Sequence, residues 1–168
     1  MKHGFMLFEL LISIALFVCI LGISSAYFEL ADSFLVKAEV DIFYTTSVYL
    51  RYRAQLERAD QFLFLDLPNN SYSYDSAHTH RLIKSVCFSA CLEAKGPPAY
   101  PEKIITKATS FVKNQIQFFA DGSLQSGSLY FSNKTKDCLY AFTIPVSVIP
   151  CMRTYWYNAP KQTWEPKL

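Results

Sequence analysis

The chain contains few charged residues. Asp, Glu, Lys and Arg together make up 18% of its 168 residues, compared with roughly 25% in an average soluble domain. A disordered chain has much charge and few aromatic residues, so this composition, with 16% aromatic residues, excludes disorder. The formal net charge of +2 also excludes a polycation that binds nucleic acid through bulk charge alone. What remains is about one domain of protein that is rich in apolar residues.

Motifs of the common enzyme classes are absent from the sequence. It has no Gly-rich phosphate loop, no HExxH motif and no GxSxG motif. We therefore expect no enzymatic activity, no cofactor and no bound metal. Pro and Gly are also absent between Ile23 and Leu67, so nothing interrupts a helix there. The sequence predicts one long helix from about Phe5 to a point between Arg58 and Leu65, with an amphipathic outer half.

Residues 10–28 contain no charged side chain. As a helix they span about 28 Å, close to the roughly 30 Å hydrocarbon core of a bilayer. Because Lys2 lies on the N-terminal side, the sequence predicts a single-pass membrane protein with a cytoplasmic N-terminus and its later residues outside. A cleaved secretory signal ending near residues 24–26 and a plain anchor are alternatives. Glu9 indicates a further role, because a carboxylate in an apolar helix is costly, unless it simply reaches the cytoplasmic interface.

Residues 4–11, GFMLFELL, resemble the processing motif of type IV prepilins and pseudopilins. That motif is a short basic leader, Gly, an aromatic residue, three apolar residues, Glu and an apolar run. The resemblance implies that a prepilin peptidase cuts between Gly4 and Phe5 and methylates the new N-terminus at Phe5. It also implies that Glu9 pairs with that amine, its own or a neighbour's, and so sets the register of an assembly. The chain departs from the family at His3, where Lys or Arg is usual, and at residues 6–8.

The resemblance also implies a location and partners. A bacterial protein of this family crosses the inner membrane once and later joins an extracytoplasmic filament, either a type II secretion pseudopilus or a type IV pilus. Its partners are other pilins or pseudopilins, the prepilin peptidase and the inner-membrane assembly platform. An anchored or secreted β-rich domain that never assembles is the alternative. The expected regions are a leader (1–4), a membrane-spanning filament-core helix (5–28), its amphipathic continuation (29–65) and a β-rich head (69–168).

The last hundred residues contain alternating or aromatic-rich runs that predict strands at Arg81–Phe88, Lys103–Thr106, Gln115–Ala120, Ser128–Ser132 and Leu139–Val148. The expected fold class is therefore α+β and pilin-like, with a long N-terminal helix, membrane-spanning in its first half, packed on a C-terminal antiparallel sheet. Phe118, Gly122 and Gly127 match the H-type minor pseudopilins and the FimT-like minor pilins. The Gly-Arg pair that usually ends this subgroup's sequence is missing from residues 148–153.

Four cysteines follow the apolar run, at Cys87, Cys91, Cys138 and Cys151. In an oxidising exterior they favour two disulfides with three possible connectivities, of which Cys87–Cys91 with Cys138–Cys151 is the most local. Four reduced, buried thiols are the alternative. A zinc site that adds His78 and His80 is a further alternative, although its spacing matches no common structural site.

The C-terminal tail interleaves cations with aromatic residues. Arg153, Lys161 and Lys167 alternate with tyrosines and tryptophans, an arrangement that suits contacts to phosphates and stacked bases. FimT-like minor pilins include DNA-capturing proteins that use their C-terminal region, so the resemblance implies DNA uptake as an alternative function. The competing interpretation is that these aromatic side chains pack on a sheet.

Overall fold

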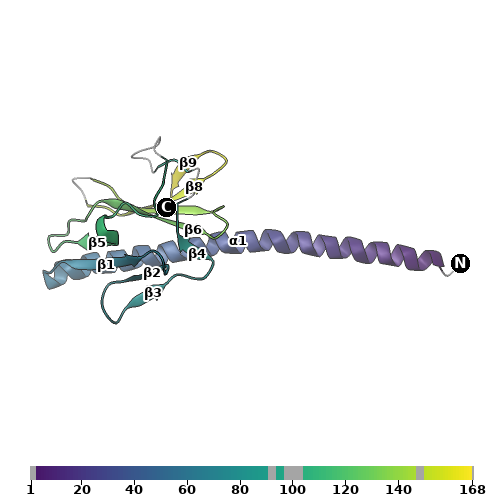
Figure 1. The fold of residues 1–168 in the computed structure, drawn as a ribbon, viewed down its shortest axis with the longest axis horizontal. Helices are drawn as coiled ribbons and strands as arrows, with labels where there is room; N and C mark the ends of the chain where they lie inside the picture. Colours follow the sequence, from purple (N-terminus) through teal and green to yellow (C-terminus); the bar gives the residue numbers. More distant parts are fainter. Residues whose placement is uncertain (1–2, 91–93, 97–103, 147–149, 168) are drawn as a thin grey trace.

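The computed structural model of the chain is a long helix that projects from a β-rich head (Figure 1). It describes residues 3–90, 94–96, 104–146 and 150–167, and within the helix it describes the side chains of residues 8–22 and 31–57. The elements in chain order are α1 (His3–Glu57), β1 (Gln61–Asp66), β2 (Ser71–Ser73), β3 (Thr79–Arg81), β4 (Val86–Phe88), a 3₁₀ turn η1 (Val112–Asn114), β5 (Gln115–Phe118), β6 (Gly127–Asn133), β7 (Leu139–Ile144), β8 (Arg153–Asn158) and β9 (Thr163–Pro166).

Helix α1 ends at Glu57, short of the predicted limit. Arg58 adopts a positive φ of 52°, and the amide of Ala59 donates to the carbonyl of Ala54 at 3.2 Å. This is the Schellman arrangement that closes many helices, here with Arg where Gly is usual. Residues 61–65, which were expected to continue the helix, belong to β1 instead. Their alternating burial suits a strand that covers the core with one face.

The head contains two antiparallel sheets. Sheet A has the strand order β3-β2-β1-β5, and sheet B has the order β4-β6-β7-β8-β9. In sheet A, β1 pairs with β5 in a register that places Leu63 opposite Ile116. In sheet B, β6 pairs with β7 so that Phe131 lies opposite Tyr140. Helix α1 contacts strands of both sheets, so the core forms where the three elements meet.

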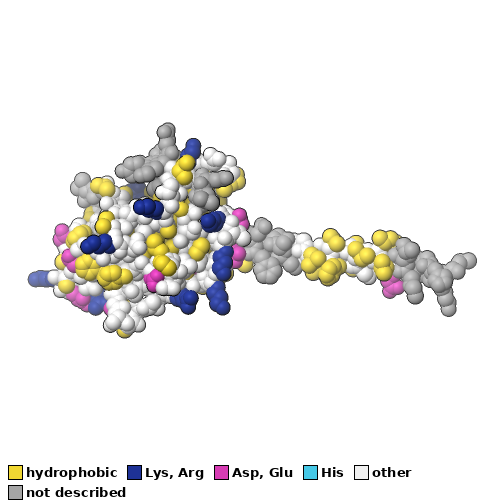
Figure 2. Space-filling view, in the orientation of Figure 1, with side chains coloured by type: hydrophobic (Ala, Val, Ile, Leu, Met, Phe, Trp, Pro, Cys, Tyr) yellow, Lys and Arg dark blue, Asp and Glu magenta, His cyan; other side chains and the backbone are white. Residues whose placement is uncertain are grey.

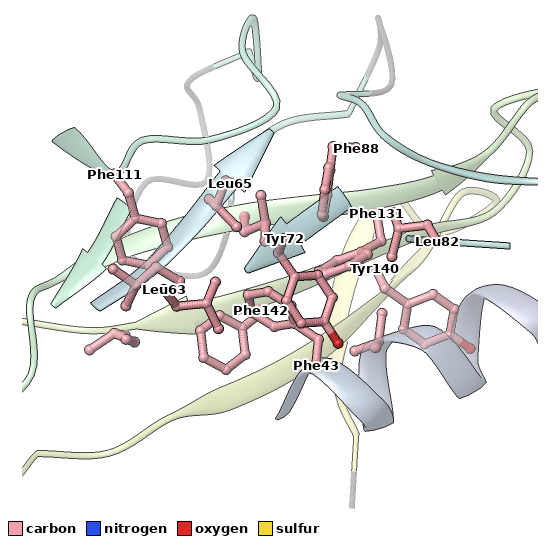
Figure 3. Packing of buried hydrophobic residues seen from close by; sticks show 14 of the residues in the cluster. Phe43, Leu63, Leu65, Tyr72, Leu82, Phe88, Phe111, Phe131, Tyr140 and Phe142 are labelled. Atoms are coloured by element: carbon pink, nitrogen blue, oxygen red, sulfur yellow. The ribbon is translucent and has the colours of Figure 1, made fainter. Parts of the chain in front are cut away.

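Phe43 of α1 lies at the centre of this core (Figure 3). Its ring makes edge contacts with Tyr72 of β2, Phe131 of β6 and Phe142 of β7, with ring centroids 5.0, 5.3 and 5.1 Å apart. The same face of α1 buries residues at spacings of three, four and seven, which are Val36, Val40, Phe43, Leu50 and Ala54. One face of α1 thus holds both sheets, and the opposite face remains exposed.

The fold class and location expected from the sequence were wrong on two points. Within the part of the chain that the structure describes, no helix is both long and apolar enough to cross a membrane, so the membrane-spanning first half and the single-pass inner-membrane location are not supported. The head also forms two sheets where one was expected.

The second sheet arises because the predicted strand Arg81–Phe88 is broken. Residues up to Arg81 belong to β3 in sheet A, and Val86–Phe88 form β4 in sheet B. Between them the amide of Val86 donates to the carbonyl of Ile83 at 2.8 Å, which turns the chain. The run predicted at Leu139–Val148 was also shorter than expected. It ends as β7 before Pro145, whose ring nitrogen cannot donate to a ladder, and it lies inside sheet B between β6 and β8.

The positions that resemble the H-type and FimT-like subgroup have clear structural roles. Phe118 is fully buried. Gly122 has a φ of +84° in the turn after β5, where its amide donates to the carbonyl of Phe119 at 2.9 Å. At Gly127 an added Cβ atom would lie 2.4 Å from Cδ1 of Phe111, so only Gly fits beside that ring. These contacts explain the residues through packing, and they leave the subgroup itself a prediction.

Candidate functional site

Residues 8–22 of α1, which we call the N-terminal arm, project away from the head (Figure 1). Every residue of the arm is exposed, and large apolar side chains such as Phe8, Leu16 and Phe17 are about 60% exposed. Figure 2 shows these side chains as apolar surface on the projecting part of the molecule. Apolar residues lie on all sides of the arm, and a helix of this kind is normally buried. The arm is therefore the strongest candidate for a binding surface in this chain.

Glu9 is the charged residue of the arm. Its backbone carbonyl accepts a hydrogen bond from Oγ of Ser13 at 2.9 Å. A shallow groove runs beside it and is lined by Glu9, Leu10, Ser13, Ile14 and Phe17. The predicted processing residues Gly4 and Phe5 lie in the first turns of α1, where the structure describes the backbone alone. Their cleavage and the methylation of Phe5 therefore stay predictions.

The structure brings two of the three cations of the predicted DNA-binding tail together, because Arg153 and Lys167 line one shallow pocket beside Asp41, and Lys161 lies apart from them. Arg153 begins β8, whereas Lys161 lies in the turn after it, so roughly 17 Å of strand separates the two ends. Lys161 pairs with Glu165 at 3.2 Å, and Lys167 pairs with Asp41 of α1. Two of the three positive charges are thus neutralised inside the chain, which weakens their attraction for phosphate.

The aromatic residues of the tail pack on sheet B. The ring of Trp164 lies 5.1 Å from that of Tyr157 and 6.1 Å from that of Tyr130, measured between centroids. Its Nε1 atom donates to the backbone carbonyl of Lys95 at 2.8 Å. A ring held in this way is not free to stack on a base, so the packing interpretation accounts for Trp164.

The cysteines that the structure describes carry free thiols. Cys138 is buried and its Sγ atom donates to Oγ of Ser33 at 3.5 Å, and burial raises the pKa of its thiol. Cys87 lies against Ser132, and Cys151 is partly exposed. Cys91 lies outside the described residues. The disulfide pairing proposed from spacing stays a prediction.

The histidines of the alternative zinc site each bond to a separate carboxylate. Nδ1 of His78 lies 2.7 Å from a carboxylate oxygen of Asp75, and Nε2 of His80 lies 2.8 Å from Oε2 of Glu39. Within the described residues, no group of three or more His, Cys, Asp and Glu side chains could hold a metal ion. The two rings therefore serve local contacts.

The Glu39 contact was not predicted from the sequence. Its carboxylate is 1% exposed and joins α1 to the end of sheet A, because Oε1 also accepts the backbone amide of Ile83 at 3.1 Å. The available signal was its position between Val36, Val40 and Phe43 on the apolar face of the helix. A charged residue on such a face is rarely buried without a partner.

Comparisons with protein families, with curated proteins and with solved structures find no match to this chain. The prepilin resemblance therefore rests on residues 4–11 and on the arm that follows them.

Proposed function

We propose that the protein is a structural subunit of a filament, of the minor pilin or pseudopilin kind, whose N-terminal arm is buried among the helices of other subunits. The observation that carries the proposal is the exposure of the arm, where Phe8, Leu16 and Phe17 are 64, 59 and 62% exposed. Burial of each such side chain contributes about 1.5–3 kcal/mol. Exposed apolar surface of this extent marks an interaction site.

The prepilin-like motif supports the same proposal. Cleavage between Gly4 and Phe5 leaves a chain that begins directly before the arm, so that the segment displayed at the new N-terminus is the apolar one. The head, with its own core of two sheets and α1, is then carried on the outside of the assembly. The protein acts through packing, and no step of this function needs a cofactor.

The intact mass of the protein purified from its native source tests the proposal. We expect the loss of residues 1–4 and the gain of one methyl group, with Phe5 as the first residue. A Gly4→Ala variant is the matched control and should keep the leader, because the motif requires Gly at the cleavage site. Loss of residues 1–26 would identify an ordinary secreted protein, and an unprocessed chain would identify one that never enters this pathway. Either result contradicts the proposal.

Assembly is tested separately by shearing filaments from cells and probing them for this chain. The wild-type chain should be present in the sheared material. The Glu9→Ala variant should be made in normal amounts but be depleted there, because its arm lacks the charge that fixes its place among other helices. Equal incorporation of the two chains would show that Glu9 has no role in assembly.

A further inference from the structure

The side of α1 that faces away from the sheets carries a second exposed apolar surface. Five side chains recur along it at intervals of eight, seven, three and four residues, which keeps them on one face of a helix. We call this surface the outer stripe, and its residues are Phe34, Ile42, Tyr49, Tyr52 and Leu56. It lies opposite the buried face that includes Val36 and Phe43. The head folds without covering it.

The outer stripe is large enough to be an interface. Phe34, Tyr52 and Leu56 are 67, 61 and 84% exposed. At roughly 150–250 Å² for a whole aromatic side chain, the five residues together expose on the order of 600 Å². That is at the upper end of the largest apolar patches on ordinary monomers, which are about 300–600 Å². It also approaches the roughly 800 Å² that each partner contributes to a standard interface.

The same chain therefore exposes two apolar helical surfaces, the N-terminal arm and the outer stripe. The arm is about 22 Å long, and the stripe from Phe34 to Leu56 is about 33 Å long. The stripe is thus long enough to accept residues 8–22 of a second copy. Two helices pack side by side at 8–10 Å when large side chains meet along such faces. An arm cannot reach the stripe of its own chain, because both belong to one straight helix.

Charge selects the register of this contact. Glu9 is the charged residue of the arm, and its burial against an apolar stripe is costly unless a cation meets it. Lys37 is exposed at the flank of the stripe. Arg53, at the other end, already bonds to Glu57 at 2.8 Å. When the two helices run parallel and Glu9 of the arm lies beside Lys37 of the other subunit, one subunit is displaced from the other by about 42 Å along the helix axis. The arm then covers Ile42 and Tyr49.

Building on the proposed function, we propose that the outer stripe of one subunit receives the N-terminal arm of a second copy, in parallel, with Glu9 of that copy paired to Lys37. This contact is separate from the pairing of Glu9 with an N-terminal amine that the family resemblance implies, because it uses a side chain of the head-bearing half of α1. In this register residues 8–22 of the arm lie level with residues 36–50, so the contact covers the middle of the outer stripe, and Tyr52 and Leu56 lie beyond the end of the arm.

Charge exchange tests the proposed pair. The variants Glu9→Lys and Lys37→Glu should each reduce the amount of chain in sheared filaments about tenfold, and the double variant should return it to within about twofold of wild type. Lys107→Glu is the matched control, since it reverses an exposed charge on the head, and it should have no effect. Failure of the double variant to recover would overturn the Glu9–Lys37 pair.

A disulfide between copies tests the register without altering the charges. In the proposed register, Cys19 of the arm lies beside Thr45 of the subunit that receives the arm. Their positions along the helix axis differ by about 3 Å. Both residues are exposed, and within one chain they are about 39 Å apart, so a bond between them can form only between copies. The Thr45→Cys variant should give a dimer under oxidation, with the 19–45 link identified by mass spectrometry.

The controls separate the two proposals. The Cys19→Ser, Thr45→Cys variant should give no such dimer, and Tyr52→Cys should give much less than Thr45→Cys because it lies about 10 Å further along α1. If wild-type filaments form but neither the 19–45 link nor the charge rescue is seen, the docking is wrong and the filament function stands. If wild-type chain is neither processed nor found in filaments, the proposed function fails and the docking fails with it.

Discussion

Replacement of Glu39 by Ala perturbs the contact that joins α1 to sheet A. The carboxylate is buried and accepts from the amide of Ile83 and the ring of His80. An unsatisfied buried amide costs about 1–3 kcal/mol, and the lost hydrogen bond to the ring of His80 adds about 1 kcal/mol. Because His80 is 35% exposed and can turn to water, we expect a total loss of about 3 kcal/mol in the free energy of unfolding.

The His80→Ala variant should lose much less stability. The Ile83 amide keeps its acceptor in that variant, and because the ring of His80 is 35% exposed we expect water to take its place beside the carboxylate. We expect a loss of about 1 kcal/mol, the size of one ordinary hydrogen bond. The structure therefore predicts that Glu39→Ala loses about three times as much free energy of unfolding as His80→Ala, although the two residues share one contact.

Urea denaturation of the whole chain measures both losses, followed through the fluorescence of Trp156 and Trp164 in sheet B. Glu57→Ala is the matched control. It removes an exposed carboxylate from the same helix and should cost under about 0.5 kcal/mol. Equal losses for Glu39→Ala and His80→Ala, or a loss below 1 kcal/mol for Glu39→Ala, would refute the view that the buried carboxylate holds this junction.

Three other changes follow from local geometry. Gly127→Ala should cost about 1–3 kcal/mol, because the new Cβ atom overlaps the buried ring of Phe111; an unchanged urea midpoint would contradict this. Arg58→Gly should raise stability by about 1 kcal/mol, because it relieves the positive φ at the end of α1, and a lower melting temperature would show that the Arg58 side chain contributes more than its backbone costs. Burial raises the pKa of Tyr72 and Tyr140 to about 12, so the folded state keeps two protons that the unfolded chain loses near pH 10. The free energy of unfolding should be constant as pH rises towards 10 and should fall between about pH 10 and 12. Constant urea midpoints across that range would argue against the burial of these two tyrosines.

Sequence patterns located some elements well and others poorly. The absence of Pro and Gly after Gly22 predicted an uninterrupted helix, and α1 is continuous there. Its end was missed because the cap is Arg58, where a Gly would have given a signal. The apolar run at residues 62–65 has no helical or strand period of its own, so it was assigned to the helix although it belongs to β1.

Long-range partners were the other source of error. The break between β3 and β4 was missed because it includes, besides the local turn between Ile83 and Val86, a hydrogen bond from the Ile83 amide to Glu39, 44 residues away. The same holds for the tail, where Lys167 meets Asp41 across 126 residues. Composition marked these cations as available to a ligand, but Lys161 pairs with Glu165 four residues away and Lys167 pairs with Asp41 of α1.

The contact between Lys167 and Asp41 has a consequence for biosynthesis. Strand β9 follows β8 in the chain, and until β9 has been made and has paired, β8 presents an open, aromatic-rich edge. Such an edge is a template for pairing with other nascent chains. A protein shortened by even its last six residues would retain that edge permanently, so loss of the C-terminus should produce aggregates. Strand β9 thus covers the aromatic-rich edge of β8, and Lys167 directly after it fastens sheet B to α1.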